Sequence, residues 1–237
     1  DDYKYVDGVH FNERKHWLND DYVKFIRFAQ YLVEKNGEGI VAFINPHGYL
    51  DNPTFRGMRW NLLKTFDKIY TIDLHGNSKK KETAPDGSAD QNVFDIMQGV
   101  SINLFVKTNK KAKNELGKVF HYDLYGKRNL KYDFLTEKTV KNIEWNNLQN
   151  VEPNLLFSTN DFKLYESYKK GIAISDIFVL NATGVKTERD SFCVKFSKNE
   201  MSEIKNDLLD LDVNTIRNKY KLNKDGRDWT VQTAQVD

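Results

Sequence analysis

The segment from Gly39 to Asp51 constrains the fold more than any other part of this chain. It begins with the apolar, largely β-branched run Ile40–Ile44 and breaks at Asn45-Pro46. Phe55–Phe66 follows, and its apolar residues recur with helical spacing. This order predicts a buried strand, a loop at its carboxyl end and a helix that packs back on a sheet. In open α/β sheets, ligands bind at such loops.

Helix and strand patterns alternate around this segment. A helix is predicted over Tyr22–Lys35, between the N-cap oxygens of 19–21 and a glycine stop at Gly37. Further strands are predicted at Lys68–Leu74 and Val100–Lys107. Because helix and strand alternate over so short a span, we expect the first two strands to form a parallel pair joined by a crossover helix. The predicted fold class is α/β, with a partial doubly wound mixed sheet.

Beyond the third strand the patterns are shorter, and their irregularity near residue 150 suggests a boundary. We interpret residues 1–18 as a lead-in loop, 19–150 as the main α/β domain and 151–237 as a smaller α+β region. A hairpin is predicted from Val119–Leu124 and Leu130–Leu135. The last region is expected to contain a short helix at Asp161–Lys170, strands at Ile174–Val179 and Phe192–Phe196, and a helix at Glu200–Lys221.

Composition excludes several classes of protein. No apolar run reaches the roughly 18 residues of a membrane span, so no membrane partner is expected. The single Cys193 excludes an internal disulfide framework and fits a reducing cytoplasm, where we expect the protein to act. The five histidines show none of the usual zinc spacings, which predicts that there is no metal site. The first residues lack an initiator Met, and we expect the chain to be a piece of a longer protein.

Positive charge gathers in one stretch although the net charge is only +2. Between residues 53 and 81 there are seven Lys or Arg against two acids. Arg56 and Arg59, near a helix start, can project from one face toward a phosphate, and Lys79, Lys80 and Lys81 in a polar loop can neutralise phosphates. A solvated helix face followed by a charged loop explains the same residues equally well.

A second candidate DNA contact is the turn 184–190. Lys186, Thr187 and Arg189 place two bases and a hydroxyl between the two predicted strands, where they could present hydrogen-bonding groups to base edges. A plain solvated turn is the alternative.

Several separated segments resemble, in order and spacing, the adenine-specific DNA methyltransferases fused into type IIG and type ISP restriction-modification enzymes. They are Asp20–Ala29, the strand through Tyr49-Leu50, Phe55–Arg59, Ile72–Asn77, Gly99–Ile102 and 184–190. The resemblance implies the second half of a Rossmann-like methyltransferase domain that runs into the target-recognition region. It implies double-stranded DNA and the rest of the parent polypeptide as partners, and a parent that uses S-adenosylmethionine to methylate adenine N6.

The segment Asn45-Pro46-His47-Gly48-Tyr49 only partly matches the catalytic tetrapeptide of that family, Asp/Asn-Pro-Pro-Tyr/Phe. There, the first side chain and the proline carbonyl accept hydrogen bonds from the adenine amino group, and the aromatic ring stacks on the flipped base. His47 replaces the second proline and Gly48 is inserted. We favour a later strand end of the family fold, which leaves Asn45, Pro46 and Tyr49 as the residues to test for catalysis.

The chain also lacks a glycine-rich turn after a strand, which S-adenosylmethionine binding requires. We therefore expect no cofactor to bind to this chain alone, and a fragment that supplies sheet core and DNA contacts without activity of its own. The alternatives are a self-contained nucleic-acid-binding α/β module and an interaction domain without enzymatic function. Half of a doubly wound sheet leaves one edge of the Ile40–Ile44 strand unpaired. Another segment or a second copy of the chain should cover this edge, and we therefore predict some self-association.

Overall fold

The computed structural model describes residues 2–11, 13, 15–112, 114–160, 162–178, 180, 189–222, 225 and 229–236. The chain divides into two compact units, Asp1–Tyr165 and Glu166–Asp237, called here the sheet unit and the helical unit. Among the described residues, no helix is both long enough and apolar enough to cross a membrane.

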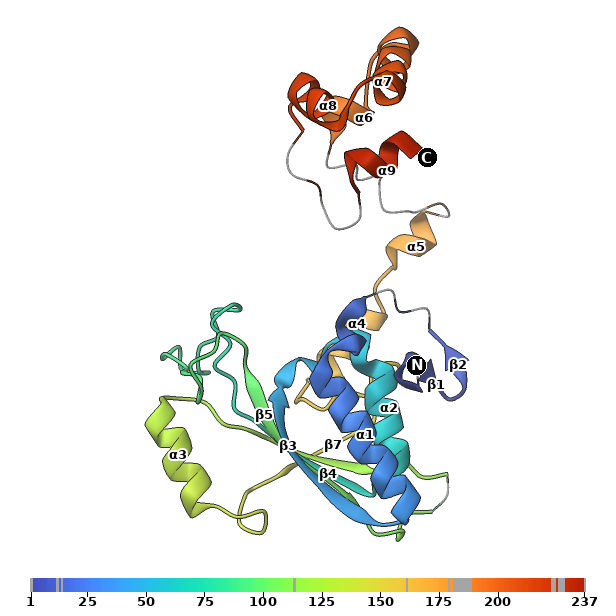
Figure 1. Ribbon diagram of the computed structural model, residues 1–237. Coiled ribbons are helices and arrows are strands. Elements are labelled where there is room, and N and C mark those ends of the chain that lie inside the picture. The colour runs from blue at the N-terminus through green and yellow to red at the C-terminus, as the bar shows by residue number, and fades with distance from the viewer. Residues whose placement is uncertain are drawn as a thin grey trace. The chain divides into compact units, whose positions relative to one another are not determined.

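The sheet unit is built on a five-stranded mixed sheet, which confirms the predicted α/β class (Figure 1). Its strand order is β3-β5-β4-β6-β7, so β3 lies at an edge. The strands are β3 (Gly39–Pro46), β4 (Lys68–Asp73), β5 (Val100–Lys107), β6 (Lys118–Asp123) and β7 (Asn146–Leu148).

The predicted parallel pairing of β3 with β4 is wrong. Both strands run in the same direction, but β5 lies between them and pairs antiparallel with each. Ile102 of β5 stands opposite Ile44 on one side and Ile72 on the other. The eight-residue β5 is long enough to pair with both neighbours along their length, whereas β4 pairs in parallel with β6.

Helices cover both faces of the sheet, as a doubly wound arrangement requires (Figure 1). On one face, helices α1 (Asp21–Asn36) and α2 (Arg56–Thr65) pack on the main core. Because side chains alternate along a strand, the opposite face presents Ile72 and Val100 to a second core, which includes Phe134 of α3 (Arg128–Glu137). Helix α1 begins after Asp20 and ends at Gly37, whose φ is 88°, as predicted. The predicted side-chain cap is wrong, because Asp20 accepts the first helical N–H groups through its backbone carbonyl only.

Helix α3 replaces the second strand of the predicted hairpin at Leu130–Leu135. A helix lets Phe134 stack on Tyr122 of β6, with ring centroids 5.1 Å apart, while Lys131 reaches the buried carboxylate of Asp90 at 2.8 Å. Tyr122 and Asp90 are distant from these residues in the sequence, so the apolar residues of Leu130–Leu135 alone did not indicate a helix.

The lead-in that was expected to be a loop contains short elements and contributes to the core. They are η1 (Asp2–Lys4), β1 (Tyr5–Val6), β2 (Val9–His10) and η2 (His16–Asn19), with η3 (His47–Tyr49) and η4 (Pro53–Phe55) further on. Tyr3 is buried, and its hydroxyl donates to Gln30 Oε1 of α1 over 2.7 Å. The lead-in is thus fixed to the first helix.

The helical unit has a small core of its own, formed by Phe192, Ile204, Ile216 and Val231. Its helices are α5 (Ile174–Ile177), α6 (Asp190–Cys193), α7 (Lys198–Asp210), α8 (Val213–Tyr220) and α9 (Val231–Val236), and α4 (Phe162–Lys169) spans the boundary between the units. The predicted helix at Asp161–Lys170 is thereby confirmed.

The strands predicted at Ile174–Val179 and Phe192–Phe196 are wrong where the structure describes them, because α5 and α6 occupy these positions. Phe192 enters the core while Phe196 is fully exposed, so the apolar alternation marks no buried strand face. The single helix predicted at Glu200–Lys221 is two helices. Asp212 separates them, because its side chain accepts the backbone N–H groups of α8 as an N-cap.

Candidate functional site

The register of the sheet aligns four polar residues at the edge where β3, β4 and β6 end. Asn45 pairs with Ser101, Ser101 with Asp73, and Asp73 with Asp123, so the four form one row across four strands. Asp73 and Asp123 therefore stand side by side, and two neighbouring carboxylates repel each other unless a cationic or hydrogen-bonding group lies between them.

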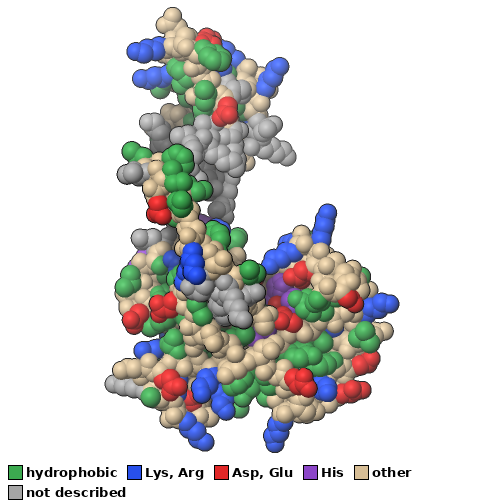
Figure 2. All heavy atoms as spheres, turned by 180° about the vertical axis from the view of Figure 1, so that it is seen from behind, with side chains coloured by type: hydrophobic (Ala, Val, Ile, Leu, Met, Phe, Trp, Pro, Cys, Tyr) green, Lys and Arg blue, Asp and Glu red, His purple; other side chains and the backbone are tan. Residues whose placement is uncertain are grey.

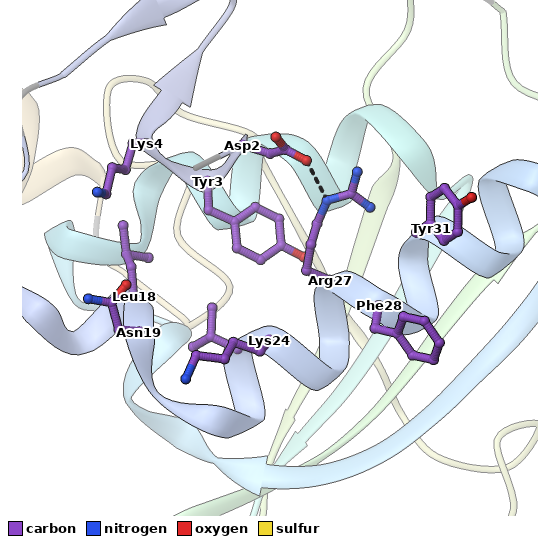
Figure 3. A pocket seen from close by; sticks show the side chains of 10 residues that line it. Asp2, Tyr3, Lys4, Leu18, Asn19, Lys24, Arg27, Phe28 and Tyr31 are labelled. Atoms are coloured by element: carbon purple, nitrogen blue, oxygen red, sulfur yellow. Dashed lines mark hydrogen bonds and ion pairs between the residues drawn. The ribbon is translucent and has the colours of Figure 1, made fainter.

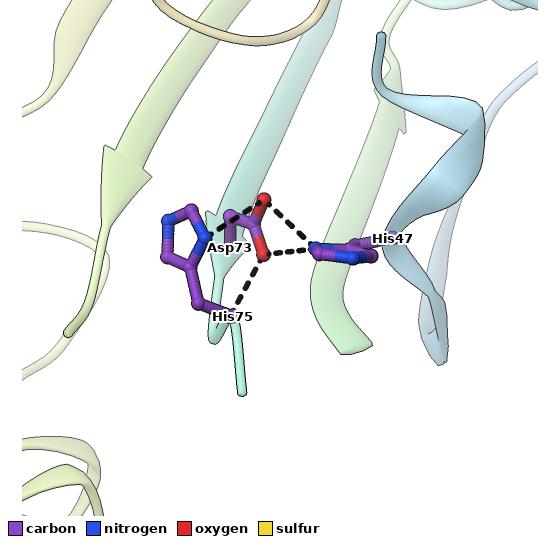
Figure 4. Close-up of side chains that lie close together, drawn as sticks. All are labelled: His47, Asp73 and His75. Carbon is purple, nitrogen blue, oxygen red and sulfur yellow. Dashed lines mark hydrogen bonds and ion pairs between the residues drawn. The ribbon is translucent and has the colours of Figure 1, made fainter. Parts of the chain in front are cut away.

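Two histidines contact these carboxylates, and Figure 4 shows their contacts with Asp73. His47 follows β3, and its Nδ1 lies 2.9 Å from Asp73 Oδ1 and 3.2 Å from Oδ2. His75 follows β4, with Nδ1 3.7 Å from Asp73 Oδ2 and Nε2 2.9 Å from Asp123 Oδ1. The ring of His75 thus bridges the two acids, and His47, Asp73 and His75 are all buried.

The cluster extends to Glu82, whose Oε1 lies 3.9 Å from His75 Nδ1, and to the ring of Tyr125, which stacks on His75 at a centroid distance of 3.9 Å. Burial lowers the pKa of His75, but the carboxylates of Asp123, Glu82 and Asp73 outweigh it and raise that pKa to about 9. Burial raises the pKa of the Asp123 carboxyl, but the rings of His121 and His75 hold it well below its usual range. The cluster therefore favours the charged forms of both His75 and Asp123 although the two side chains are largely buried.

His121 completes the surroundings of Asp123. It is fully buried, and its Nε2 lies 3.0 Å from Asp123 Oδ1 without the alignment of a hydrogen bond. Seen from the opposite side, the molecule shows histidine side chains beside acidic ones in a recess of its surface (Figure 2). The side chains of Glu82 and Asp123 are 20% and 24% exposed, so solvent reaches the His-carboxylate cluster, the name used here for His47, Asp73, His75, Glu82, His121 and Asp123.

The residues named as candidates for catalysis lie beside this cluster but face inward. Asn45 Oδ1 accepts from Asn103 Nδ2 over 2.7 Å, and the Asn45 amide donates to the carbonyl of Pro46. Tyr49 is fully buried, its ring packs edge-on against Phe157, and its hydroxyl donates to Asn103 Oδ1 over 2.6 Å. In this arrangement neither face of the Tyr49 ring is open to a base.

The paired projection of Arg56 and Arg59 toward a phosphate is wrong, because Arg59 is completely buried. Its guanidinium donates to the backbone carbonyls of Tyr49, Asn52 and Asn154 at 2.6–2.9 Å. Burial lowers the pKa of Arg59 to about 10. Arg56 is half-buried, with its guanidinium 4.1 Å from the ring centre of Phe11.

Lys79, Lys80 and Lys81 are exposed, at the same edge of the sheet as the His-carboxylate cluster. Their loop is anchored: the N–H of Lys80 donates to the carbonyl of Asn77, and residues 83 and 89 form an isolated β-bridge. These lysines are thus presented on a folded loop.

A pocket of about 970 Å³ opens between residues 76–97 and the start of α3. Phe94 and Met97, which line it, are exposed.

The second candidate DNA contact is only partly described. Lys186 and Thr187 lie outside the described residues. Arg189 is described, and its guanidinium lies 4.2 Å from the ring centre of Trp229 in the helical unit.

A separate pocket of about 510 Å³ lies between the lead-in and α1 (Figure 3). Arg27 Nε donates to Asp2 Oδ2 over 2.7 Å, and its Nη1 lies 3.2 Å from Glu34. Arg27 is thus held by two carboxylates, and apolar side chains such as Val23 and Phe28 line part of the pocket.

Sequence reasoning missed the His-carboxylate cluster. His47, Asp73 and Asp123 lie on three separate strand ends, so no motif spacing brings them together. The signal that could have found them was the strand-end position itself, since codirectional strands end at one edge of a sheet.

Comparisons with known proteins find similarity to restriction-modification enzymes. Residues 176–237 match the family model described as the Type ISP C-terminal specificity domain. Over 87% of its length the chain is similar to the ATP-dependent Type ISP restriction-modification enzyme LlaBIII bound to DNA, with 25% identity and a TM-score of 0.59. No curated protein matches the chain.

Two further structures share the fold. One is a DrdV–DNA complex (95% of the chain, 22% identity, TM-score 0.61). The other is a nuclease-deletion mutant of the Type ISP enzyme LlaGI in complex with a DNA substrate mimic (94%, 23% and 0.61). The chain spans only 24% of the DrdV chain, 15% of the LlaBIII chain and 19% of the LlaGI chain.

Proposed function

We propose that this chain is part of a restriction-modification enzyme of the Type ISP kind and that it contacts double-stranded DNA there. The match of residues 176–237 to the Type ISP specificity domain carries the proposal. The likeness to DNA-bound LlaBIII extends it to the sheet unit.

In finer terms, residues 19–150 act as the second half of an adenine-N6 DNA methyltransferase domain, and the segment after residue 150 begins the target-recognition region. S-adenosylmethionine binds elsewhere in the cytoplasmic parent enzyme, because none of the strands that the structure describes is followed by a Gly-x-Gly turn. The chain supplies sheet core and DNA contacts. The parent transfers the methyl group to a flipped adenine.

The edge strand β3 is the proposed contact with the rest of the parent or with a second copy. In the described part of the sheet β3 pairs only with β5, and Ile40 and Ile44 are 69% and 50% exposed. An apolar edge with unpaired backbone groups is a template for another strand. Sedimentation at increasing concentration tests self-association, and a strictly monomeric profile would leave the parent polypeptide as the partner.

Salt-dependent DNA binding tests the proposal directly. A labelled duplex is titrated with the chain at several NaCl concentrations, and log K is expected to fall linearly with log[salt]. Substituting Lys79, Lys80 and Lys81 with Ala should flatten the slope by up to about 0.9 for each phosphate that the loop no longer neutralises. Absence of binding at low ionic strength would refute the DNA role of this chain.

The matched control is the triple substitution Lys35→Ala, Lys138→Ala and Lys141→Ala. These three lysines are exposed and their removal changes the net charge by the same amount. They lie at or just beyond the carboxyl ends of α1 and α3, away from the edge where β4 ends. An equal change of slope in both triple variants would mean that net charge, and not the loop, governs binding.

Calorimetric titration with S-adenosylmethionine tests the finer proposal. No heat is expected from the isolated chain, and methyl transfer by it is not expected either. Binding at micromolar strength would place a cofactor site in this chain, and Asn45, Pro46 and Tyr49 would then have to be tested by substitution as catalytic residues.

A further inference from the structure

We propose that His47, Asp73 and His75 form a binding site for a divalent transition metal ion, with zinc as the best chemical match. Each of the three residues offers one ligand atom, and these atoms all lie within 4.8 Å of one another. Two imidazole nitrogens and one carboxylate oxygen are the donor set of many zinc sites that leave a position for a further ligand. Zinc binding at these residues does not require that the chain bind DNA.

The backbone is shaped to bring these donors together. His75 has φ 49° and Gly76 has φ 76°, so the chain turns in the left-handed region immediately after β4. The turn is fixed by Asp73 Oδ1, which accepts the backbone N–H of His75 over 2.9 Å. This turn brings the His75 ring back toward the carboxylate of Asp73, the last residue of β4.

On the other side, Gly99 makes room for the ring of His47. A Cβ atom at Gly99 would lie 2.5 Å from His47 Cε1 and Nε2, a distance that side chains cannot tolerate. The backbone N–H of His47 also donates to the carbonyl of Gly99 over 3.0 Å, which extends the β3–β5 pairing by one residue. Both histidines are therefore positioned by backbone features and not only by their side-chain contacts.

The outer ring nitrogens have the partners that metal-bound histidines usually have. His75 points Nδ1 toward Asp73 and holds Nε2 2.9 Å from Asp123 Oδ1. A carboxylate on the far nitrogen orients the ring and increases its basicity as a ligand. His47 Nε2 lies 3.2 Å from the side-chain amide of Asn77, and an amide can offer a donor or an acceptor to either tautomer.

Charge balance also favours a cation. Asp73, Glu82 and Asp123 bring three carboxylates to a largely buried place, and within the described residues no Lys or Arg pairs with any of them. The imidazoles of His47, His75 and His121 are the groups that face these carboxylates. A divalent ion held by Asp73 and the two histidines would add positive charge beside the acids, and Glu82 or a water molecule can provide a fourth ligand.

The test is calorimetric titration of the tag-free full chain with ZnCl₂ after dialysis against a chelator. One ion should bind per chain, and the double variant His47→Gln/His75→Gln should lose that binding. Asp123→Asn should weaken it by about 10–100-fold, because only the orientation of His75 is affected. The control variant His16→Gln removes an exposed histidine outside the site and should bind like the wild type.

X-ray absorption at the zinc edge is measured on the wild-type chain. Its result therefore does not depend on whether the double variant folds. It should show two imidazole ligands with oxygen atoms completing the shell. Absence of stoichiometric binding to the wild type would overturn the proposal and would assign the cluster to hydrogen-bonded ion pairs alone. A zinc shell without imidazole, or binding that survives in a folded double variant, would overturn it as well.

Discussion

The two units of this chain bury very different side chains. In the described residues, every buried polar or charged side chain belongs to the sheet unit, including the fully buried Arg59 and Lys131. The buried residues described in the helical unit are the four hydrophobic members of its core. A buried ion must be paired or hydrogen-bonded, so the sheet unit requires many specific contacts to be in place at once.

This difference separates the evidence for family from the evidence for chemistry. The helical unit contains the segment that matches the Type ISP specificity family, yet its core is a simple apolar cluster. The sheet unit contains the His-carboxylate cluster and is related to known structures at low identity. The family match therefore falls in the unit with an apolar core, and the candidate chemical site falls in the unit that buries polar side chains.

The largest expected effect comes from Arg59→Met in the sheet unit. The substitution leaves three backbone carbonyls without their donor. Each buried acceptor left unsatisfied typically costs about 1–3 kcal/mol of unfolding free energy. Urea denaturation measures the loss of unfolding free energy, and hydrogen exchange of the backbone amides in β3 and β4 shows whether it lies in the sheet unit. Exchange in α7 and α8 should remain unchanged if the comparison between the units holds.

Arg56→Ala is the matched control, since Arg56 precedes Arg59 by about one helical turn but stacks on Phe11. A cation–π contact of this exposure contributes roughly 0.5–1 kcal/mol. Equal destabilisation by the two variants would show that the carbonyl contacts of Arg59 carry no special weight.

Much of the fold could be predicted because a long segment shows the spacing of its apolar residues over several repeats, which distinguishes a helix from a strand. Helix α1 and the strands β3, β4 and β5 lie where the sequence places them, since each has several apolar residues in register. Helix α3 could not be predicted, because its orientation depends on Lys131 meeting Asp90, 41 positions earlier in the chain. Short apolar runs such as Phe192–Phe196 are likewise ambiguous until their partners are known.

The candidate site could be predicted only in its location. The loops at the ends of β3 and β4 were the expected place for ligands, and the His-carboxylate cluster lies there. Its membership depends on the register that sets Asp73 beside Asp123, which no local pattern contains. Arg56 and Arg59 illustrate the same limit, because about one helical turn separates a half-buried arginine from a completely buried one.

An intermediate effect is expected from Ile216→Ala in the helical unit. Ile216 is fully buried on α8, and truncating such a side chain typically costs roughly 2–4 kcal/mol through reduced burial and the cavity left behind. Hydrogen exchange in α7 and α8 should accelerate while β3–β5 keeps its protection. Leu209→Ala on α7 is the control, because Leu209 is 68% exposed and its truncation should change little. Acceleration in the sheet as well would mean that the units unfold together.

The smallest effect is expected from Tyr49→Phe, which removes one hydroxyl from the sheet unit and keeps the ring. Burial raises the pKa of Tyr49 well above its ordinary value, so the phenol is a neutral donor to Asn103 Oδ1. Leaving that buried acceptor unpaired should cost about 1–2 kcal/mol of unfolding free energy, measured by urea denaturation. Tyr31→Phe is the control on the exposed side of α1.

The outcome decides what the buried polar contacts of the sheet unit depend on. Destabilisation confined to Tyr49→Phe would mean that the amides of Asn45 and Asn103 are held by this hydroxyl, so that Tyr49 has a structural task. If both tyrosine variants are destabilised equally little, the amides keep each other in place through the 2.7 Å bond from Asn103 Nδ2 to Asn45 Oδ1. The contrast between the two units would then rest on charged groups such as Arg59 alone.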